Sequence, residues 1–70
     1  MRVKNTIKVE RARHNYTKEK LAELAGVSRQ TINAIEKGNY VPSTVLALRL
    51  ARVFQVPVEQ LFELEEEDLA

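Results

Sequence analysis

A cluster of hydrogen-bonding side chains at residues 28–33 is the part of this chain best suited to chemistry. It comprises Ser28, Arg29, Gln30, Thr31 and Asn33. In the major groove of DNA, arginine can pair with O6 and N7 of guanine, and an amide can pair with N6 and N7 of adenine. A helix beginning at Ser28 would carry these groups on its outer surface. The cluster therefore predicts a helix that reads DNA bases.

Two short helices joined by a tight corner are expected to position this cluster. Thr17 and Ser28 are suitable N-caps, because their hydroxyls can accept a backbone N–H from the first turn. Gly26 and Gly38 stand where helices commonly end in a left-handed residue. The apolar residues expected on the buried seam are Leu21, Leu24, Ala25, Ile32 and Ile35. The alternative is an αα-hairpin of an ordinary helical bundle, which would not need the polar cluster.

The candidate DNA contacts fall into two groups. Base contacts are expected from Arg29, Gln30, Thr31, Asn33 and Ala34, with Asn33 reading adenine or touching a phosphate. Phosphate contacts are expected from Thr17, Lys18, Ser28, Lys37, Asn39, Tyr40 and Ser43. The alternative for each residue is a solvated polar side chain.

The remaining residues predict an all-α chain of five short helices. The three outside the corner cover residues 5–15, 43–55 and 57–63, and no convincing period-2 strand pattern is present. Ile7 and Ala12 are the inward candidates of the first helix. We expect one domain over residues 1–64 and an acidic tail over residues 65–70.

The formal charge is divided unevenly along the chain. Residues 1–52 hold all eleven Lys and Arg against four Glu, a formal charge of +7, and residues 53–70 hold six acidic residues and no basic one. A basic body suits a polyanionic partner such as double-stranded DNA, and the acidic tail suits another role. The alternative is a solvated surface with a solubilising tail.

Composition argues against several other classes of protein. The 70 residues contain no cysteine, no apolar run long enough to span a membrane and no secretory signal pattern, so a cytoplasmic protein is expected. The single histidine, His14, is expected to be solvated at a helix end. No catalytic set, metal-ligand cluster or cofactor motif is recognisable, so we expect no enzyme, metal or cofactor.

The helix at residues 43–55 is apolar on more than one face. Such a helix is either fully buried or shared with a partner, and full burial is difficult in so small a domain. We therefore expect a homodimer whose interface includes Val53, Leu61, Phe62 and Leu64. The alternative is that these residues cover the core of a monomer.

Residues 21–43, LAELAGVSRQTINAIEKGNYVPS, resemble the lambda-repressor-like, or Cro/C1-type (XRE), helix-turn-helix regulators. The resemblance covers about residues 7–64 and looks like a minimal stand-alone member. It favours repression over activation, and the expected two-fold homodimer would select a palindromic operator. It also implies a structural ion pair between Arg11 and Glu36, and it places Lys18 where the family usually has glutamine. The alternative is an antitoxin or another protein-interaction module that uses the acidic C-terminus.

Overall fold

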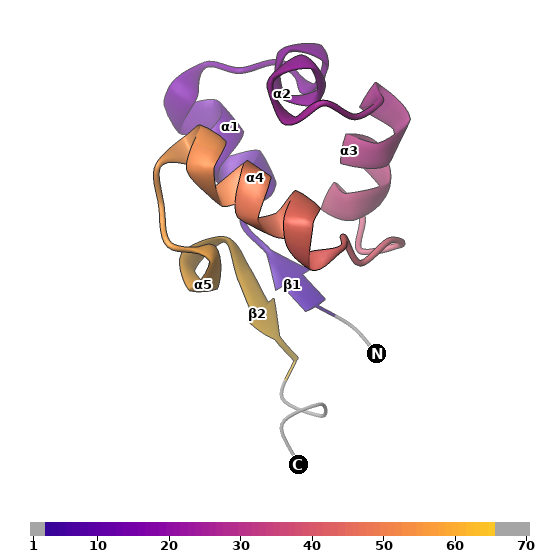
Figure 1. Ribbon diagram of the computed structural model, residues 1–70, viewed down its shortest axis with the longest axis vertical. Helices are drawn as coiled ribbons and strands as arrows, with labels where there is room; N and C mark the ends of the chain where they lie inside the picture. Colours follow the sequence, from indigo (N-terminus) through magenta and orange to yellow (C-terminus); the bar gives the residue numbers. More distant parts are fainter. Residues whose placement is uncertain (1–2, 66–70) are drawn as a thin grey trace.

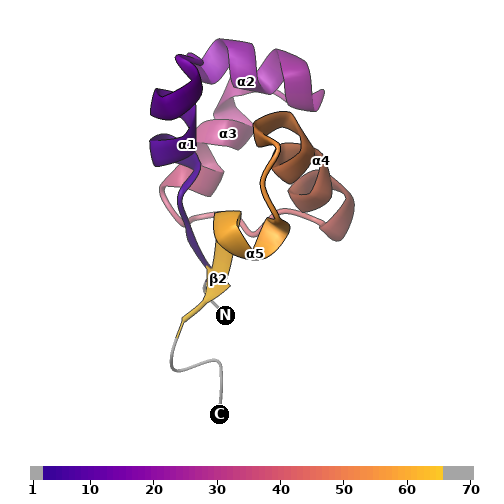
Figure 2. The same cartoon turned by 90° about the vertical axis from the view of Figure 1, so that its left-hand side faces the viewer.

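Five helices and a two-stranded ribbon make up the computed structural model, which describes residues 3–65 (Figures 1 and 2). The helices follow one another around a common core, and the ribbon brings the two ends of the described chain together. The elements in chain order are β1 (Val3–Asn5), α1 (Ile7–His14), α2 (Lys18–Ala25), α3 (Arg29–Glu36), α4 (Thr44–Phe54), α5 (Val58–Leu61) and β2 (Phe62–Leu64). The five helices predicted from the sequence are present, together with a strand pair that was not predicted.

Three of the helices begin at a hydroxyl N-cap. The Oγ1 of Thr17 accepts from the backbone N–H of Lys20 at 3.0 Å, and the Oγ of Ser28 accepts from that of Thr31 at 3.1 Å. Ser43 caps α4 in the same way. Each such cap contributes about 1 kcal/mol by satisfying a donor that the first turn leaves unpaired. Side chains close to the helices in sequence thus fix where α2, α3 and α4 start.

A left-handed glycine makes the corner between α2 and α3. Gly26 has φ of +74°, and its backbone N–H closes the last turn of α2. A side chain at this backbone conformation would be strained, whereas glycine is not. The two helices are therefore joined by a turn short enough to pack α3 directly against α2.

The core lies between the five helices and is almost entirely aliphatic. Its buried members are Ile7, Leu21, Ala22, Ala25, Ile32, Ile35, Leu46, Leu50, Ala51, Phe54 and Leu61. Burying a large apolar side chain stabilises the fold by about 1.5–3 kcal/mol. Two residues that were expected in the core are not buried there: Leu24 is 44% exposed, and Ala12 is exposed. Their helices are only eight residues long, so each buries a narrow face.

The ribbon is the main departure from the predicted secondary structure. β1 pairs antiparallel with β2, with Asn5 opposite Phe62 and Val3 opposite Leu64. The expected helices at residues 5–15 and 57–63 are therefore shorter than predicted. α1 starts at Ile7, and α5 ends at Leu61 because Phe62 is extended, with φ of −128° and ψ of 141°.

The acidic tail predicted for residues 65–70 lies outside the described residues from position 66 onward. Within residues 3–65, none of the helices has the length and apolar character needed to cross a bilayer.

Candidate nucleic-acid interface

The outer side of α3 carries the predicted base-reading residues. α3 lies at the edge of the molecule, with α2 packed across it (Figure 1). Ile32 and Ile35 point into the core, so the opposite side of the helix faces outward. Arg29 and Gln30 are exposed there, and Thr31, Asn33 and Ala34 are half-buried. The five predicted residues therefore share one short helix, and its first turn is the most accessible.

Arg29 is tied to α2 by an ion pair. Its Nε lies 3.0 Å from Oε2 of Glu19, and both side chains are more than half exposed. The guanidinium also carries two terminal nitrogens, at the end of a side chain that is 57% exposed. These nitrogens are the donors needed for a bidentate contact with guanine.

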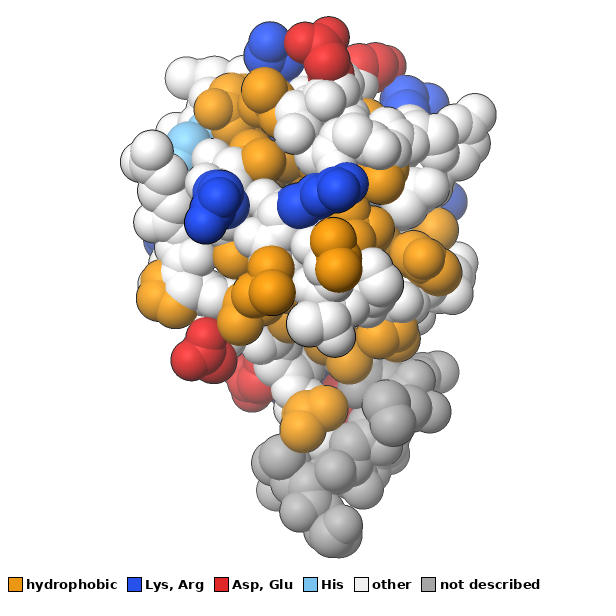
Figure 3. Space-filling view, in the orientation of Figure 1, with side chains coloured by type: hydrophobic (Ala, Val, Ile, Leu, Met, Phe, Trp, Pro, Cys, Tyr) orange, Lys and Arg blue, Asp and Glu red, His pale blue; other side chains and the backbone are white. Residues whose placement is uncertain are grey.

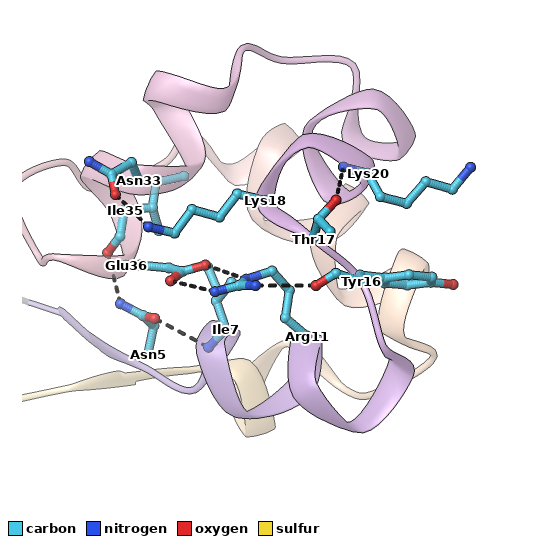
Figure 4. Close-up of polar contacts among 10 residues, drawn as sticks. All are labelled: Asn5, Ile7, Arg11, Tyr16, Thr17, Lys18, Lys20, Asn33, Ile35 and Glu36. Atoms are coloured by element: carbon cyan, nitrogen blue, oxygen red, sulfur yellow. Dashed lines mark hydrogen bonds and ion pairs between the residues drawn. The ribbon is translucent and has the colours of Figure 1, made fainter.

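Asn33 is tied to the same end of α2. The Nζ of Lys18 donates to Oδ1 of Asn33 at 2.8 Å, and Figure 4 shows the two side chains meeting between the helices. An ammonium group has three N–H donors, so Lys18 can hold Asn33 and still donate to another acceptor. Lys18 thus supports α3 directly, although it replaces the glutamine usual in the family it resembles.

The other predicted phosphate contacts lie on both sides of α3. Thr17 and Ser28 stand at the starts of α2 and α3, and Ser43 stands at the start of α4. Each hydroxyl accepts from the backbone, and that of Ser28 also shares a hydrogen bond with Oγ1 of Thr31 at 3.0 Å. Three more candidates, Lys37, Asn39 and Tyr40, are exposed in the loop after α3. The candidates form two groups of donors that flank the helix.

An ion pair beneath the interface fixes the end of α3 to α1. Arg11 donates from Nε to Oε2 of Glu36 at 2.8 Å and from Nη2 to Oε1 at 3.3 Å (Figure 4). Its Nη1 also donates to the carbonyl oxygen of Tyr16 at 3.1 Å. The two side chains are only 16% and 8% exposed. This geometry assigns Arg11 a structural place and removes it from the groups available to DNA.

Asn5 supports the same end of α3 and was missed from the sequence. Its Nδ2 donates to the carbonyl oxygen of Ile35 at 2.9 Å, and its Oδ1 accepts from the backbone N–H of Ile7 at 3.2 Å (Figure 4). One side chain therefore links the end of α3 to the start of α1. The only available signal was an asparagine two residues before a helix, which is compatible with an Asx turn.

His14 is not a solvated helix-end residue. Its ring packs against those of Tyr16 and Phe54, with centroids 5.4 and 5.3 Å away. Its Nδ1 also lies 2.9 Å from the carbonyl oxygen of Glu10. The histidine is therefore part of the packing beneath α1. Among residues 3–65, no group of three or more His, Cys, Asp or Glu side chains is placed to hold a metal ion.

The predicted dimer residues occupy different depths. Leu61 has no exposed surface and belongs to the core of the single chain, so its expected contact with a partner is wrong. Val53 and Phe62 are half-buried and pack against that core. Leu64 is 45% exposed at the end of β2. Only part of the predicted set is therefore accessible.

A helix-turn-helix family model matches residues 7–61 of this chain, which spans α1 to α5. The chain belongs to this family. The match identifies it as a Cro/C1-type (XRE) member, a family of DNA-binding transcriptional regulators. It adds no support for the alternative of an antitoxin or protein-interaction module.

Known proteins of similar sequence carry the same description. YgzD of Bacillus subtilis, an uncharacterised HTH-type transcriptional regulator, is 53% identical over 66 residues, which cover 94% of this chain and 100% of YgzD. MJ0272 of Methanocaldococcus jannaschii, described in the same words, is 52% identical over the same shares of the two chains.

The restriction-modification controller protein C.AhdI of Aeromonas hydrophila has a similar structure. Its TM-score is 0.72 at 26% identity, over 77% of this chain and 82% of that one.

Proposed function

We propose that this regulator is a repressor that reads a palindromic operator in the major groove as a homodimer. The observation that carries the proposal is the outer face of α3, where Arg29 and Gln30 stand exposed between two groups of phosphate-binding candidates. Phosphate contacts would supply most of the affinity, and the base contacts of α3 would supply the specificity.

An exposed apolar patch on α4 and the ribbon supports the homodimer. We define the α4 patch by its four large exposed apolar residues, Val41, Val45, Leu48 and Leu64, which are 45–60% exposed. Three of them line a hollow of about 320 Å³ together with Phe62. A standard interface buries about 800 Å² per partner, about one-sixth of the 4920 Å² of this chain. The patch gives a second copy an apolar centre on which to pack.

Charges on the two sides of the α4 patch suit a second copy of the same chain. Arg49 and Arg52 line a second hollow with Val45 and Leu48, and they form no ion pair with the described residues. Figure 3 shows a basic pair above an apolar band, with acidic side chains below it. A two-fold axis along this band would place the basic side of each copy against the acidic side of the other.

The same axis suits DNA binding. α3 lies at the right-hand edge of the molecule in Figure 1, which has the orientation of Figure 3. A rotation about an axis along the band keeps α3 on that edge, so both copies of α3 would face one side. Two recognition helices that face one side can enter successive major grooves, with half-sites about 34 Å apart.

Base reading is tested with Arg29→Ala and Gln30→Ala. Each variant should lose preference at particular base pairs of a selected operator, by about 1–3 kcal/mol per good bidentate contact. The control is Lys37→Ala, which should weaken binding equally on all sequences because it contacts phosphate. Titration of each variant against operator variants gives the preferences. Equal weakening of every operator variant by Arg29→Ala and Gln30→Ala would contradict base reading.

The dimer is tested with Leu48→Glu. Burying a carboxylate at the centre of an apolar interface is costly, so the variant should sediment as a monomer at concentrations where the wild type is a dimer. The matched control is Val9→Glu on α1, since Val9 is 52% exposed and does not line either hollow of the patch. A wild-type monomer at tens of micromolar, or an undiminished dimer in Leu48→Glu, would contradict this interface.

Repression is tested with a reporter gene whose promoter overlaps the selected operator. The bound dimer should exclude polymerase, so expression should fall when the protein is present and should not fall with Arg29→Ala. A rise in expression would identify an activator.

A further inference from the structure

Two adjacent residues at the start of α2 hold two predicted base readers of α3. Lys18 Nζ donates to Asn33 Oδ1 at 2.8 Å, and Glu19 Oε2 forms an ion pair with Arg29 Nε at 3.0 Å. Arg29 and Asn33 are four residues apart, so they lie on the same face of α3. We name Lys18 and Glu19 the α2 pair. Through these two contacts, α2 determines which atoms of Arg29 and Asn33 remain available for hydrogen bonds to DNA.

The contact with Lys18 fixes the orientation of the Asn33 amide. An ammonium group only donates hydrogen bonds, so the atom that faces it must be the amide oxygen. Figure 4 shows the amide nitrogen of Asn33 pointing away from Lys18. A bidentate contact with adenine needs the amide oxygen to accept from N6 while the nitrogen donates to N7. With the oxygen directed back to α2, Asn33 presents N–H donors to a ligand.

The contact with Glu19 leaves Arg29 with the donors that guanine requires. Glu19 Oε2 lies 3.0 Å from Nε, and the two terminal nitrogens stand at the end of a side chain that is 57% exposed. Holding Nε in place restricts the rotation of the guanidinium at the end of this long side chain. A carboxylate so near the phosphate-binding candidates Thr17 and Lys18 would repel DNA unless it were paired, and Arg29 supplies that pairing.

We propose that the α2 pair makes the Arg29 and Asn33 face of α3 a surface of donors only, and so selects base edges rich in acceptors. Arg29 reads guanine through O6 and N7. Asn33 donates to N7 or O6 of guanine or to O4 of thymine and does not select adenine, in contrast to the expectation from its residue type alone. Lys18 and Glu19 are positioning residues for this selection. The inference rests on the proposed function, because it names the bases that the same face selects.

The test of Lys18 uses selection of binding sites from random-sequence duplex DNA with the full chain. Asn33→Ala first identifies the base pair that depends on Asn33. Lys18→Met then frees the amide oxygen, and adenine should rise at that base pair by about threefold or more relative to the wild type. The control is Lys20→Met, which removes a lysine of the same helix whose partner is Glu23, and it should leave the preference unchanged. Adenine already preferred by the wild type, or unchanged in Lys18→Met, would overturn the inference.

The test of Glu19 compares two substitutions. Glu19→Ala should reduce discrimination for guanine at the base pair that depends on Arg29 by roughly two- to fivefold, the range of an exposed ion pair. Glu19→Gln should reduce it less, because the neutral amide oxygen lacks the charge but can still accept a hydrogen bond near Nε. Glu23→Ala on the same helix serves as the control and should change neither.

A purely structural role for Glu19 gives a different result. Glu19 lies in the first turn of α2, where an acidic residue stabilises the helix through its dipole. In that case Glu19→Ala would lower the melting temperature and leave guanine discrimination intact, which would overturn the inference. Selection that enriches no sequence with the wild type would overturn the proposed function as well. An enriched sequence unaffected by Lys18→Met and Glu19→Ala would overturn this inference alone.

Discussion

At the residue scale, the effect of an ion pair on stability depends on how deeply the pair is buried. Arg11 and Glu36 form a bidentate pair that is nearly buried, whereas Lys20 and Glu23 are at least half exposed. Removing one partner of a buried pair leaves an uncompensated charge in the interior, but an exposed pair is well solvated after the change. Burial therefore decides which ion pairs matter for stability.

Substitution of Arg11 should destabilise the protein far more than substitution of Lys20. We expect Arg11→Ala to lower the free energy of unfolding by about 3–5 kcal/mol, because it leaves Glu36 unpaired and the Tyr16 carbonyl without its donor. Lys20→Ala should lower it by at most about 1 kcal/mol. Urea unfolding followed by circular dichroism measures both values. Equal values for the two variants would show that the Arg11 pair is not structural.

The residue types of α3 indicated which hydrogen bonds its side chains can make, but not the contacts that hold these side chains in the fold. Residue types alone indicated that Arg29 and Asn33 have the chemistry to pair with bases. They could not show that Glu19 and Lys18 hold them, because these contacts link residues 10 and 15 positions apart through the packing of two helices. The base preference of an amide depends on its orientation, which only the three-dimensional contact fixes.

At the element scale, features set by neighbours in sequence were predictable and features set by distant segments were not. Thr17, Ser28 and Gly26 act on their own helix ends, so the positions of α2 and α3 followed from local chemistry. The ribbon pairs residues 3–5 with residues 62–64. A strand of three residues is too short to show an alternating pattern, and its pairing across the whole chain leaves no local signal.

Asn5 joins the ribbon to the helices, and removal of its side chain should measurably lower the stability of the protein. Asn5→Ala removes the donor to the Ile35 carbonyl and the acceptor for the Ile7 N–H. We expect it to lower the free energy of unfolding by about 1–3 kcal/mol, the cost of leaving partly buried backbone groups unpaired. Asn39→Ala, in an exposed loop, should have an effect within about 0.5 kcal/mol. A similar small effect of both variants in urea unfolding would contradict the linking role of Asn5.

At the scale of the whole molecule, charge and shape support the two partners proposed for the chain, double-stranded DNA and a second copy of itself. The basic residues lie in the first 52 positions and the acidic surplus follows them. α3 and its flanking donors occupy one edge of the molecule, and the α4 patch occupies a different face (Figures 1 and 3). A dimer built on the patch would leave both edges free, which is the arrangement that a two-fold symmetric DNA site requires.

Affinity should fall with salt in proportion to the phosphate contacts. Lys37→Ala should make the slope of log affinity against log salt concentration shallower by about 1 per protein chain, because one phosphate contact is lost. Lys8→Ala, an exposed lysine of α1 outside the predicted contacts, is the control and should leave the slope unchanged. An unchanged slope in Lys37→Ala would remove Lys37 from the phosphate contacts.

The measurement that tests sequence-specific reading by a dimer most directly is selection of binding sites by the wild-type chain from random-sequence duplex DNA. We predict an enriched inverted repeat whose half-sites are centred about one helical turn apart, with guanine prominent in each half-site. The same selection with Arg29→Ala should lose that guanine. Selection that yields no enriched sequence, or only a single half-site, would contradict a homodimer that reads a palindrome with α3.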